Sequence, residues 1–374
     1  MTVKNTPFQE VLDDRHGWIE RYKKETGRKI AGYFCDYVPE EVLWAAGYTT
    51  VRITGGTGNI QSADHHLQSN VCSFARRCLD QALEGVFDYL DALVVPHTCD
   101  VITKMYDLWA YRLTGPEFIH YIWVPHKVFD KDAPAVMEGE IKRLVKSLSE
   151  HTGQEITDES LAEAIRVYDR SRSLLKKVYD LRKRPSRVSG VEAFSLALSS
   201  ILAPKDLHAD WTETWLSENG DREAIPDRPR VMLAASVLDD LSMLETIEDA
   251  GAWVVADDVC TGSRYFYDLV GDPGENPLKA LTSRYLNKLP CPRSFESMQR
   301  RTEHILGQAR EFDAQGIVFD ILRCCDAHLF QYPILKERAE KEGLSVLYVQ
   351  GDRTVGINEG TKNRLQAFAE MLST

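Results

Sequence analysis

The stretch Gly316-Ile-Val-Phe-Asp-Ile-Leu-Arg-Cys-Cys-Asp-Ala-His-Leu-Phe-Gln-Tyr-Pro333 decides the fold. Residues 317–322 are apolar, rich in β-branched and aromatic side chains, and preceded by a glycine. This pattern predicts a short buried strand. Because Cys324 and Cys325 follow directly, we expect this strand to deliver a thiol at its carboxyl end.

Two earlier stretches repeat this design. Residues 29–34 form an apolar run that leads into Cys35, and residues 92–96 lead through His97 to Cys99. In open α/β sheets, ligands bind beyond the carboxyl ends of the strands. Cysteines that are far apart in the sequence are therefore predicted to meet at one site.

The order of elements predicts an α/β fold. Short apolar strands alternate with helical segments over residues 28–125 and again after residue 229, which is typical of parallel sheets. Residues 132–203 show helical periodicity instead. We therefore expect two Rossmann-like parallel-sheet domains joined by a helical segment. The predicted boundaries are 1–130 for the N-terminal α/β domain, 131–228 for the helical connection and 229–374 for the C-terminal α/β domain.

Composition narrows the function. The 374 residues carry a formal net charge of −12, which argues against nucleic acids and anionic membrane surfaces as partners. The N-terminus lacks the apolar core of a signal peptide, and no run approaches the length of a membrane span, so we expect a cytoplasmic protein. In that compartment the eight cysteines are expected to be free, metal-bound or catalytic rather than paired in disulfides.

The thiols at the strand ends leave three chemical roles open. Thiolates are ligands for zinc and for iron–sulfur clusters, a cysteine can act as a nucleophile, and buried cysteines are often only small apolar side chains. The last role is expected for Cys72 and Cys78, which fall in a segment predicted to be helical, residues 63–86. His97 and His328 lie close in sequence to two of the strand-end thiols.

Residues 257–264 follow another predicted strand. The backbone N–H groups of Thr261, Gly262 and Ser263 could face an anion, with Arg264 supplying the opposite charge. The alternative is a capped turn in which Arg264 forms a structural ion pair.

The chain resembles the family of (R)-2-hydroxyacyl-CoA dehydratases and ATP-dependent benzoyl-CoA reductases. The resemblance covers essentially the whole chain in order. It is carried by Gly32-Tyr-Phe-Cys-Asp-Tyr-Val-Pro-Glu-Glu-Val-Leu-Trp-Ala-Ala-Gly47, Leu67-Gln-Ser-Asn-Val-Cys-Ser-Phe74, Pro96-His-Thr-Cys-Asp100, Asp257-Asp-Val-Cys-Thr-Gly-Ser-Arg-Tyr-Phe266 and Cys325-Asp-Ala-His-Leu-Phe-Gln-Tyr-Pro333.

The resemblance implies a [4Fe–4S] cluster in the cleft between two α/β domains. Matched by position, its ligands are Cys35, Cys99 and Cys325, while Cys324 is a neighbour. Two departures bear on this assignment: Ala327 stands where relatives often have Pro, and some relatives shift the first cysteine by a few residues.

The resemblance also implies a function. The chain is expected to be the smaller iron–sulfur subunit of an ATP-dependent benzoyl-CoA or aroyl-CoA reductase. It would pair with a homologous larger cluster-binding subunit and receive low-potential electrons from an ATP-hydrolysing iron–sulfur activator. The alternatives are the beta subunit of an (R)-2-hydroxyacyl-CoA dehydratase, an electron-relay or scaffold subunit, and a small-molecule reductase with a double-cubane cluster.

Two groups of side chains receive roles under this expectation. His97 and His328 are candidate proton donors to the reduced substrate. Asp258 joins Thr261, Gly262, Ser263 and Arg264 as a candidate loop for the acyl-CoA or the cleft.

Overall fold

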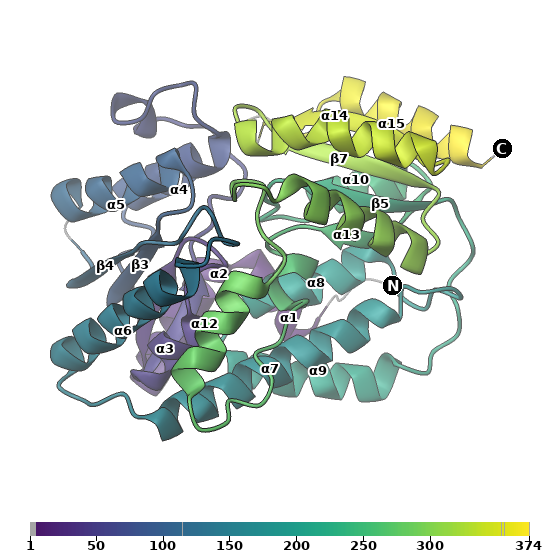
Figure 1. Ribbon diagram of the computed structural model, residues 1–374. Helices are drawn as coiled ribbons and strands as arrows, with labels where there is room; N and C mark the ends of the chain where they lie inside the picture. The colour runs from purple at the N-terminus through teal and green to yellow at the C-terminus, as the bar shows by residue number, and fades with distance from the viewer. Residues whose placement is uncertain (1–4, 114, 353, 355, 374) are drawn as a thin grey trace.

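A computed structural model describes residues 5–113, 115–352, 354 and 356–373 (Figure 1). Its strands are β1 (Lys29–Tyr33), β2 (Tyr48–Arg52), β3 (Ala92–Pro96), β4 (Phe118–Ile122), β5 (Arg230–Ala235), β6 (Trp253–Asp258), β7 (Gly316–Leu322) and β8 (Ser345–Gly351). Its helices are α1 (Pro7–Asp13), α2 (Arg15–Thr26), α3 (Glu40–Ala45), the 3₁₀ turn η1 (Ala63–His65), α4 (Ser73–Leu83), α5 (Asp100–Arg112), α6 (Ala133–Thr152), α7 (Asp158–Asp180), α8 (Gly190–Ser200), α9 (Lys205–Asn219), α10 (Ser242–Asp249), α11 (Ser263–Phe266), α12 (Pro277–Asn287), α13 (Met298–Glu311), α14 (Asp326–Lys341) and α15 (Glu359–Leu372).

The strands form two four-stranded sheets with the same plan. The first has the order β2-β1-β3-β4 and the second β6-β5-β7-β8. Every neighbouring pair is parallel, with β1 bonded to both β2 and β3, and β5 bonded to both β6 and β7. The predicted α/β class with two parallel sheets is therefore confirmed. The strands of one sheet lie within residues 29–122 and those of the other within 230–351, although the exact domain boundaries remain a prediction.

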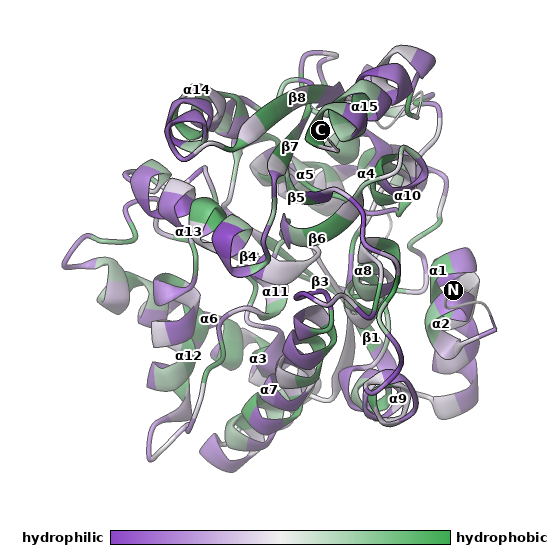
Figure 2. Cartoon of the chain, turned by 90° about the vertical axis from the view of Figure 1, so that its right-hand side faces the viewer, coloured by the Kyte–Doolittle hydropathy of each residue, from purple (hydrophilic) through white to green (hydrophobic). Residues whose placement is uncertain are grey.

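Burial explains why these segments form strands. All seven residues of β7 are buried, as are all residues of β3 and β5, which matches their nearly continuous apolar sequences. Figure 2 shows β6, β7 and β8 mainly in green, whereas the outer helices carry purple surfaces. The edge strands β4 and β8 are less shielded, because β4 alternates buried and half-buried residues and most residues of β8 are half-buried.

The helical middle section packs against both halves. α7 contacts α3 from the N-terminal half and also α11 and α12 from the C-terminal half. Two buried ion pairs anchor this section: Arg172 of α7 donates to Glu41 at 2.6 Å, and Arg182, two residues past the end of α7, donates to Asp257 at 3.2 Å. α7 and the residues that follow it therefore connect the two halves through buried charged contacts.

The predicted helices differ from the structure in three places. First, residues 204–228, which follow the stretch with predicted helical periodicity, contain α9, whose buried positions include His208 and Thr212 in place of aliphatic residues. Second, α11 and α12 were not predicted.

The third difference concerns the segment predicted as one helix over residues 63–86. It consists of η1 and α4, with a non-helical connection between them. The Asp80 carboxylate accepts hydrogen bonds from the N–H groups of Ser62 and Ala63, which holds the start of η1 against α4. As a result, Cys72 is the N-cap residue of α4 rather than part of the helix, whereas Cys78 is inside it.

The carboxyl ends of the two sheets contact each other. Arg52, the last residue of β2, donates from Nη2 to Cys260 Sγ at 3.0 Å, just past β6. The N–H groups of Gly55 and Gly56 donate to Asp239, beyond β5, at 2.8 and 2.7 Å. The loops at this junction therefore form one continuous region between the sheets.

Candidate site at the sheet junction

Cys35 follows β1 and lies beside a buried ion pair. Lys288 Nζ lies 2.7 Å from the Asp36 carboxylate and also donates to the Asp36 carbonyl at 2.8 Å. Burial alone would raise the pKa of Asp36, but Lys288 and Arg52 outweigh it and hold the pKa at about 2. Asp36 is thus a fixed negative charge next to the thiol. Burial raises the pKa of the Cys35 thiol, and Asp36 raises it further.

Cys325 ends the turn after β7 and caps α14. Its Sγ lies 3.3 Å from His328 Nδ1, one helical turn further on. Burial raises the pKa of the Cys325 thiol, and the nearby thiols of Cys72, Cys291 and Cys99 raise it further. Cys99, the N-cap residue of α5, is itself exposed. Cys325 and Cys99 therefore belong to one neighbourhood, although they come from different sheets.

Cys291 connects this neighbourhood to Cys35. Its charge contributes to the raised pKa of all three predicted ligands, Cys35, Cys99 and Cys325. The Cys291 N–H donates to Tyr37 Oη at 3.1 Å, two residues past Cys35. Sequence reasoning missed Cys291, because it lies in a loop after α12 rather than at the end of a strand. The flanking prolines at 290 and 292 are the only local signal.

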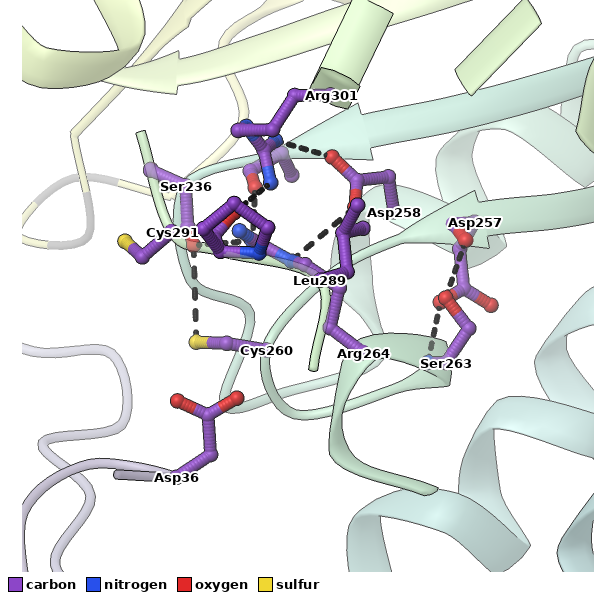
Figure 3. A network of polar contacts seen from close by, with 12 residues as sticks. Asp36, Ser236, Asp257, Asp258, Cys260, Ser263, Arg264, Leu289, Cys291 and Arg301 are labelled. Atoms are coloured by element: carbon purple, nitrogen blue, oxygen red, sulfur yellow. Dashed lines mark hydrogen bonds and ion pairs between the residues drawn. The ribbon is translucent and has the colours of Figure 1, made fainter. Parts of the chain in front are cut away.

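Cys260 and Cys72 are two further thiols of the junction. Cys260 accepts from Arg52 and, like Cys291, raises the pKa of Cys35. Cys72 was expected to be a structural thiol within a helix, but it lies at a helix start, close enough to Cys325 to raise its pKa. Figure 3 shows the sulfur atoms of Cys260 and Cys291 pointing away from the ion pairs around Asp258.

The loop after β6 is closely hydrogen-bonded within the protein. Arg264 is buried, with Nε 3.2 Å from Asp258 Oδ1, and it donates to the Ala235 carbonyl at 3.1 Å. The Ser263 N–H donates to the Asp257 carboxylate at 2.8 Å. Thr261 Oγ1 donates to the Leu238 carbonyl, and Gly262 is the residue before α11.

A second arginine holds the same carboxylate. Arg301 from α13 donates to Asp258 and also to the Pro290 carbonyl at 2.9 Å, next to Cys291 (Figure 3). Arg264 and Arg301 keep the pKa of Asp258 at about 2, against the effect of burial. The structure thus contains the ion pair of Arg264 that was expected if this loop is only a capped turn. The role of residues 258 and 261–264 toward an acyl-CoA stays a prediction.

His97 and His328 lie on opposite sides of the junction. His97 stacks on His126 with ring centres 4.7 Å apart, and on Trp123 at 5.9 Å. Burial lowers the pKa of His328 well below its usual value, and the positive charges of Arg264 and Arg301 lower it further. His328 is therefore a neutral imidazole near pH 7, in which one ring nitrogen carries a hydrogen and the other can accept a proton.

The positions of the cysteines bear on the predicted iron–sulfur cluster. In the described residues, no group of three or more His, Cys, Asp or Glu side chains converges as the ligands of a single metal ion would. A four-iron cluster differs, because each thiolate binds a different iron and the thiols need only surround one space. Cys35, Cys99 and Cys325 all begin loops or helices at the junction, and their role as cluster ligands stays a prediction. Because the pKa values of these thiols are raised, a cation would be needed to turn them into thiolates.

None of the helices in the described ranges combines the length and apolar character that a membrane span requires.

Several known proteins are similar to this chain along nearly its full length. The family model described as 2-hydroxyglutaryl-CoA dehydratase, D-component, matches residues 35–372. The chain is 25% identical to the (R)-phenyllactyl-CoA dehydratase beta subunit of Clostridium sporogenes over 367 residues, covering 98% of this chain and 97% of that protein. It is also 25% identical to a benzoyl-CoA reductase subunit of Thauera aromatica, with coverages of 93% and 92%. The beta subunit of (R)-2-hydroxyglutaryl-CoA dehydratase from Acidaminococcus fermentans is 24% identical, with 98% of both chains covered.

Proposed function

Because the chain belongs to the family of 2-hydroxyglutaryl-CoA dehydratase D-components, we propose that it holds a [4Fe–4S] cluster in a multi-subunit enzyme acting on a CoA thioester. The proposal is supported mainly by one observation. Three strand ends from two sheets bring Cys35, Cys99 and Cys325 to one junction, where Cys291 lies within electrostatic reach of all three. The relatives are subunits of dehydratases and of a reductase.

The three cysteines would hold the group, and each would bind one iron. A cluster of this type supplies one-electron chemistry at low potential, which the protein tunes through hydrogen bonds and burial. His328, 3.3 Å from Cys325 Sγ, would orient that ligand and donate to its sulfur. Asp36, held by Lys288, would fix the loop that carries Cys35.

The remaining side chains would manage protons and water. We propose His97 and His328 as the proton donors for the reduced substrate; because both have lowered pKa values, each would first take up a proton at its unprotonated ring nitrogen and then pass it on. The buried ion pairs of Asp258 with Arg264 and Arg301 would form one wall of the site and leave the cysteines available to bind the cluster. Exclusion of water would limit loss of the electron to solvent protons.

Two reactions share this electron-transfer step. The first candidate is reduction of the aromatic ring of benzoyl-CoA or another aroyl-CoA, the reaction favoured from sequence. The second is radical elimination of water from an (R)-2-hydroxyacyl-CoA. The dehydratase candidate is favoured by relatives whose names specify phenyllactyl-CoA, lactoyl-CoA and 2-hydroxyglutaryl-CoA dehydratases. An electron-relay subunit and a double-cubane reductase are the further alternatives that follow from the sequence.

The proposed partners are a homologous larger cluster-binding subunit and an ATP-hydrolysing iron–sulfur activator. The relatives are named as subunits of complexes, which supports a multi-subunit enzyme. The cytoplasm remains the predicted compartment.

Iron and acid-labile sulfide, measured on protein purified without oxygen, test the cluster. About four irons per chain are expected, with an EPR signal that changes when the substrate thioester is added. Benzoyl-CoA and (R)-phenyllactyl-CoA, added separately with the partner subunit and activator, distinguish ring reduction from water elimination. Folded protein without iron would refute the proposal, and a cluster unaffected by either thioester would favour the relay role.

Serine variants test the ligand set. Cys35→Ser, Cys99→Ser and Cys325→Ser should each lower bound iron, because a neutral hydroxyl is a poor ligand for a cluster. Cys78→Ser is the matched control, since Cys78 is fully buried inside α4. Equal iron in all four variants would remove these cysteines from the site.

A further inference from the structure

Arg293 is a half-buried cation whose charge is not neutralised by a carboxylate in the described residues. All three guanidinium nitrogens, Nε, Nη1 and Nη2, are buried, and none makes a hydrogen bond within the described part of the chain. Its guanidinium lies over the Tyr37 ring, 4.5 Å from the ring centre. Buried polar groups are normally hydrogen-bonded. An arginine that lacks a hydrogen-bond partner within the described residues therefore indicates that a ligand supplies the missing acceptor.

The loop that carries Arg293 is fixed on both sides. On one side the Cys291 N–H donates to Tyr37 Oη at 3.1 Å. On the other, the Phe295 N–H donates to the His126 carbonyl at 2.8 Å. Arg293 lies midway between these two bonds and is therefore held between Tyr37 and His126.

Two imidazole side chains, those of His97 and His126, lie beside Arg293. His97 and His126 stack with their centres 4.7 Å apart and their planes inclined by 13°. His97 Nδ1 and His126 Nε2 are also buried without a hydrogen bond among the described residues. The bond from Phe295 to the His126 carbonyl places the Arg293 loop beside His126, which stacks on His97, and the Arg293 charge lowers the pKa of His126.

We propose that Arg293, His97 and His126 form a binding subsite for an anionic oxygen group, a carboxylate or a phosphate, beside the cysteine junction. Arginine binds both groups through two parallel hydrogen bonds, and an imidazole N–H adds a third donor. The subsite lies near the surface, because Arg293 and His97 are themselves only half-buried.

The identity of the anion rests on the proposed function. If the enzyme acts on a CoA thioester, the group is either a carboxylate at the far end of the acyl chain or a phosphate of the CoA itself. Free succinate and inorganic phosphate carry the same chemistry without a thioester. Their binding tests the subsite even if the proposed thioester reaction is wrong.

Calorimetric titration of protein purified without oxygen tests the subsite. The probes are succinate, inorganic phosphate, succinyl-CoA and butyryl-CoA; the two thioesters have four-carbon acyl chains and differ in the terminal carboxylate. Arg293→Met should weaken binding of the recognised anion roughly tenfold or more, because a charge-assisted pair is lost. Arg293→Lys should recover part of the affinity, since it restores the charge but not the planar fork.

The control is Arg300→Met. Arg300 is an exposed arginine in α13 that donates to the Asn287 carbonyl at 2.6 Å, and its loss should leave anion affinity unchanged. Arg293→Met should also melt within a few degrees of the wild-type temperature, since it loses only the contact with the Tyr37 ring and leaves no hydrogen-bonding group without its partner. A purely structural arginine would instead lower the melting temperature when replaced.

The outcomes separate the sources of the anion. Weaker binding of succinyl-CoA but not butyryl-CoA assigns the subsite to an acyl-chain carboxylate. Equal weakening of both thioesters, together with weaker phosphate binding, assigns it to a CoA phosphate. Wild-type affinity of Arg293→Met for every probe, or no binding of any probe by the wild type, would overturn the subsite. Thioester binding that survives in Arg293→Met would leave the proposed function intact.

Discussion

The two sheets have the same strand order but carry different chemistry at their carboxyl ends. In the first sheet, β1 and β3 lead to the thiols of Cys35 and Cys99. In the second, β6 leads to Asp257 and Asp258, whose carboxylates are held by buried arginines. β7 adds Cys325 to this second edge. Strand order thus determines where loops meet, whereas the residues after each strand decide whether an edge supports the fold or can react.

The largest effect is expected from a variant that breaks an ion pair of Asp258, at the carboxyl end of the second sheet. Arg301→Met leaves Asp258 with one buried partner and removes the donor to the Pro290 carbonyl, so unfolding should become easier by about 3–5 kcal/mol. Urea denaturation measures the loss. Arg310→Met is the control: its ion pair with Glu342 is mostly exposed, and removal should cost less than about 1 kcal/mol. Equal stabilities for the two variants would contradict the structural role of this edge.

Acid should weaken the ion pairs that Asp258 makes with Arg264 and Arg301. The pKa of Asp258 is about 2 in the folded protein and 3.8 in its usual range. A carboxyl with a lowered pKa stabilises the fold above its unfolded value and loses that contribution as pH falls through the folded value. The free energy of unfolding should therefore fall by about 2 kcal/mol from this group between pH 5 and pH 2. Asp258→Asn should show a shallower pH dependence; an identical slope would count against the assignment.

A third variant tests the link between the two edges. Arg52→Met removes the hydrogen bonds from β2 to the carbonyl and Sγ of Cys260. Bonds from a charged donor contribute more than neutral ones, so a loss of about 2 kcal/mol is expected in thermal or urea unfolding. Wild-type stability in this variant would show that the sheets are held together without this contact.

The smallest effect on stability is expected at Cys99, beyond the carboxyl end of the first sheet. Cys99 is exposed, so Cys99→Ser should change the free energy of unfolding of the cluster-free protein by less than about 0.5 kcal/mol. Bound iron should fall nevertheless. Cys78→Ser should do the reverse, costing about 1–3 kcal/mol by burying a hydroxyl while iron is retained. The crossed result distinguishes ligands from packing, and parallel changes in both variants would contradict the comparison.

Most of the fold followed from local patterns. Apolar runs that were buried on both faces predicted β3, β5 and β7 and therefore the parallel sheets. α9 was missed, because its buried face uses His208 and Thr212, which satisfy each other by hydrogen bonds and leave no apolar stripe to detect. α12 was missed in a region of mixed composition that packs against α6.

The candidate site was only partly predictable. Strand ends indicated Cys35, Cys99 and Cys325, since the carboxyl end of a parallel strand has a known place. Cys291 and Arg293 lie in a loop whose position depends on contacts with Tyr37 and His126. Those contacts join residues about 170 to 250 positions apart, so no local pattern could reveal them.

The short turn after β7 has a consequence for how this protein can change during evolution. Cys324 adopts φ = 66°, a left-handed conformation that costs a residue with a side chain roughly 1–2 kcal/mol, and the Cys325 N–H closes the turn onto the Leu322 carbonyl at 3.0 Å. One extra or missing residue here would rotate Cys325 away from the junction and shift the start of α14. Residue 324 should therefore favour glycine or asparagine among relatives, whereas an insertion or deletion between residues 322 and 325 should be selected against.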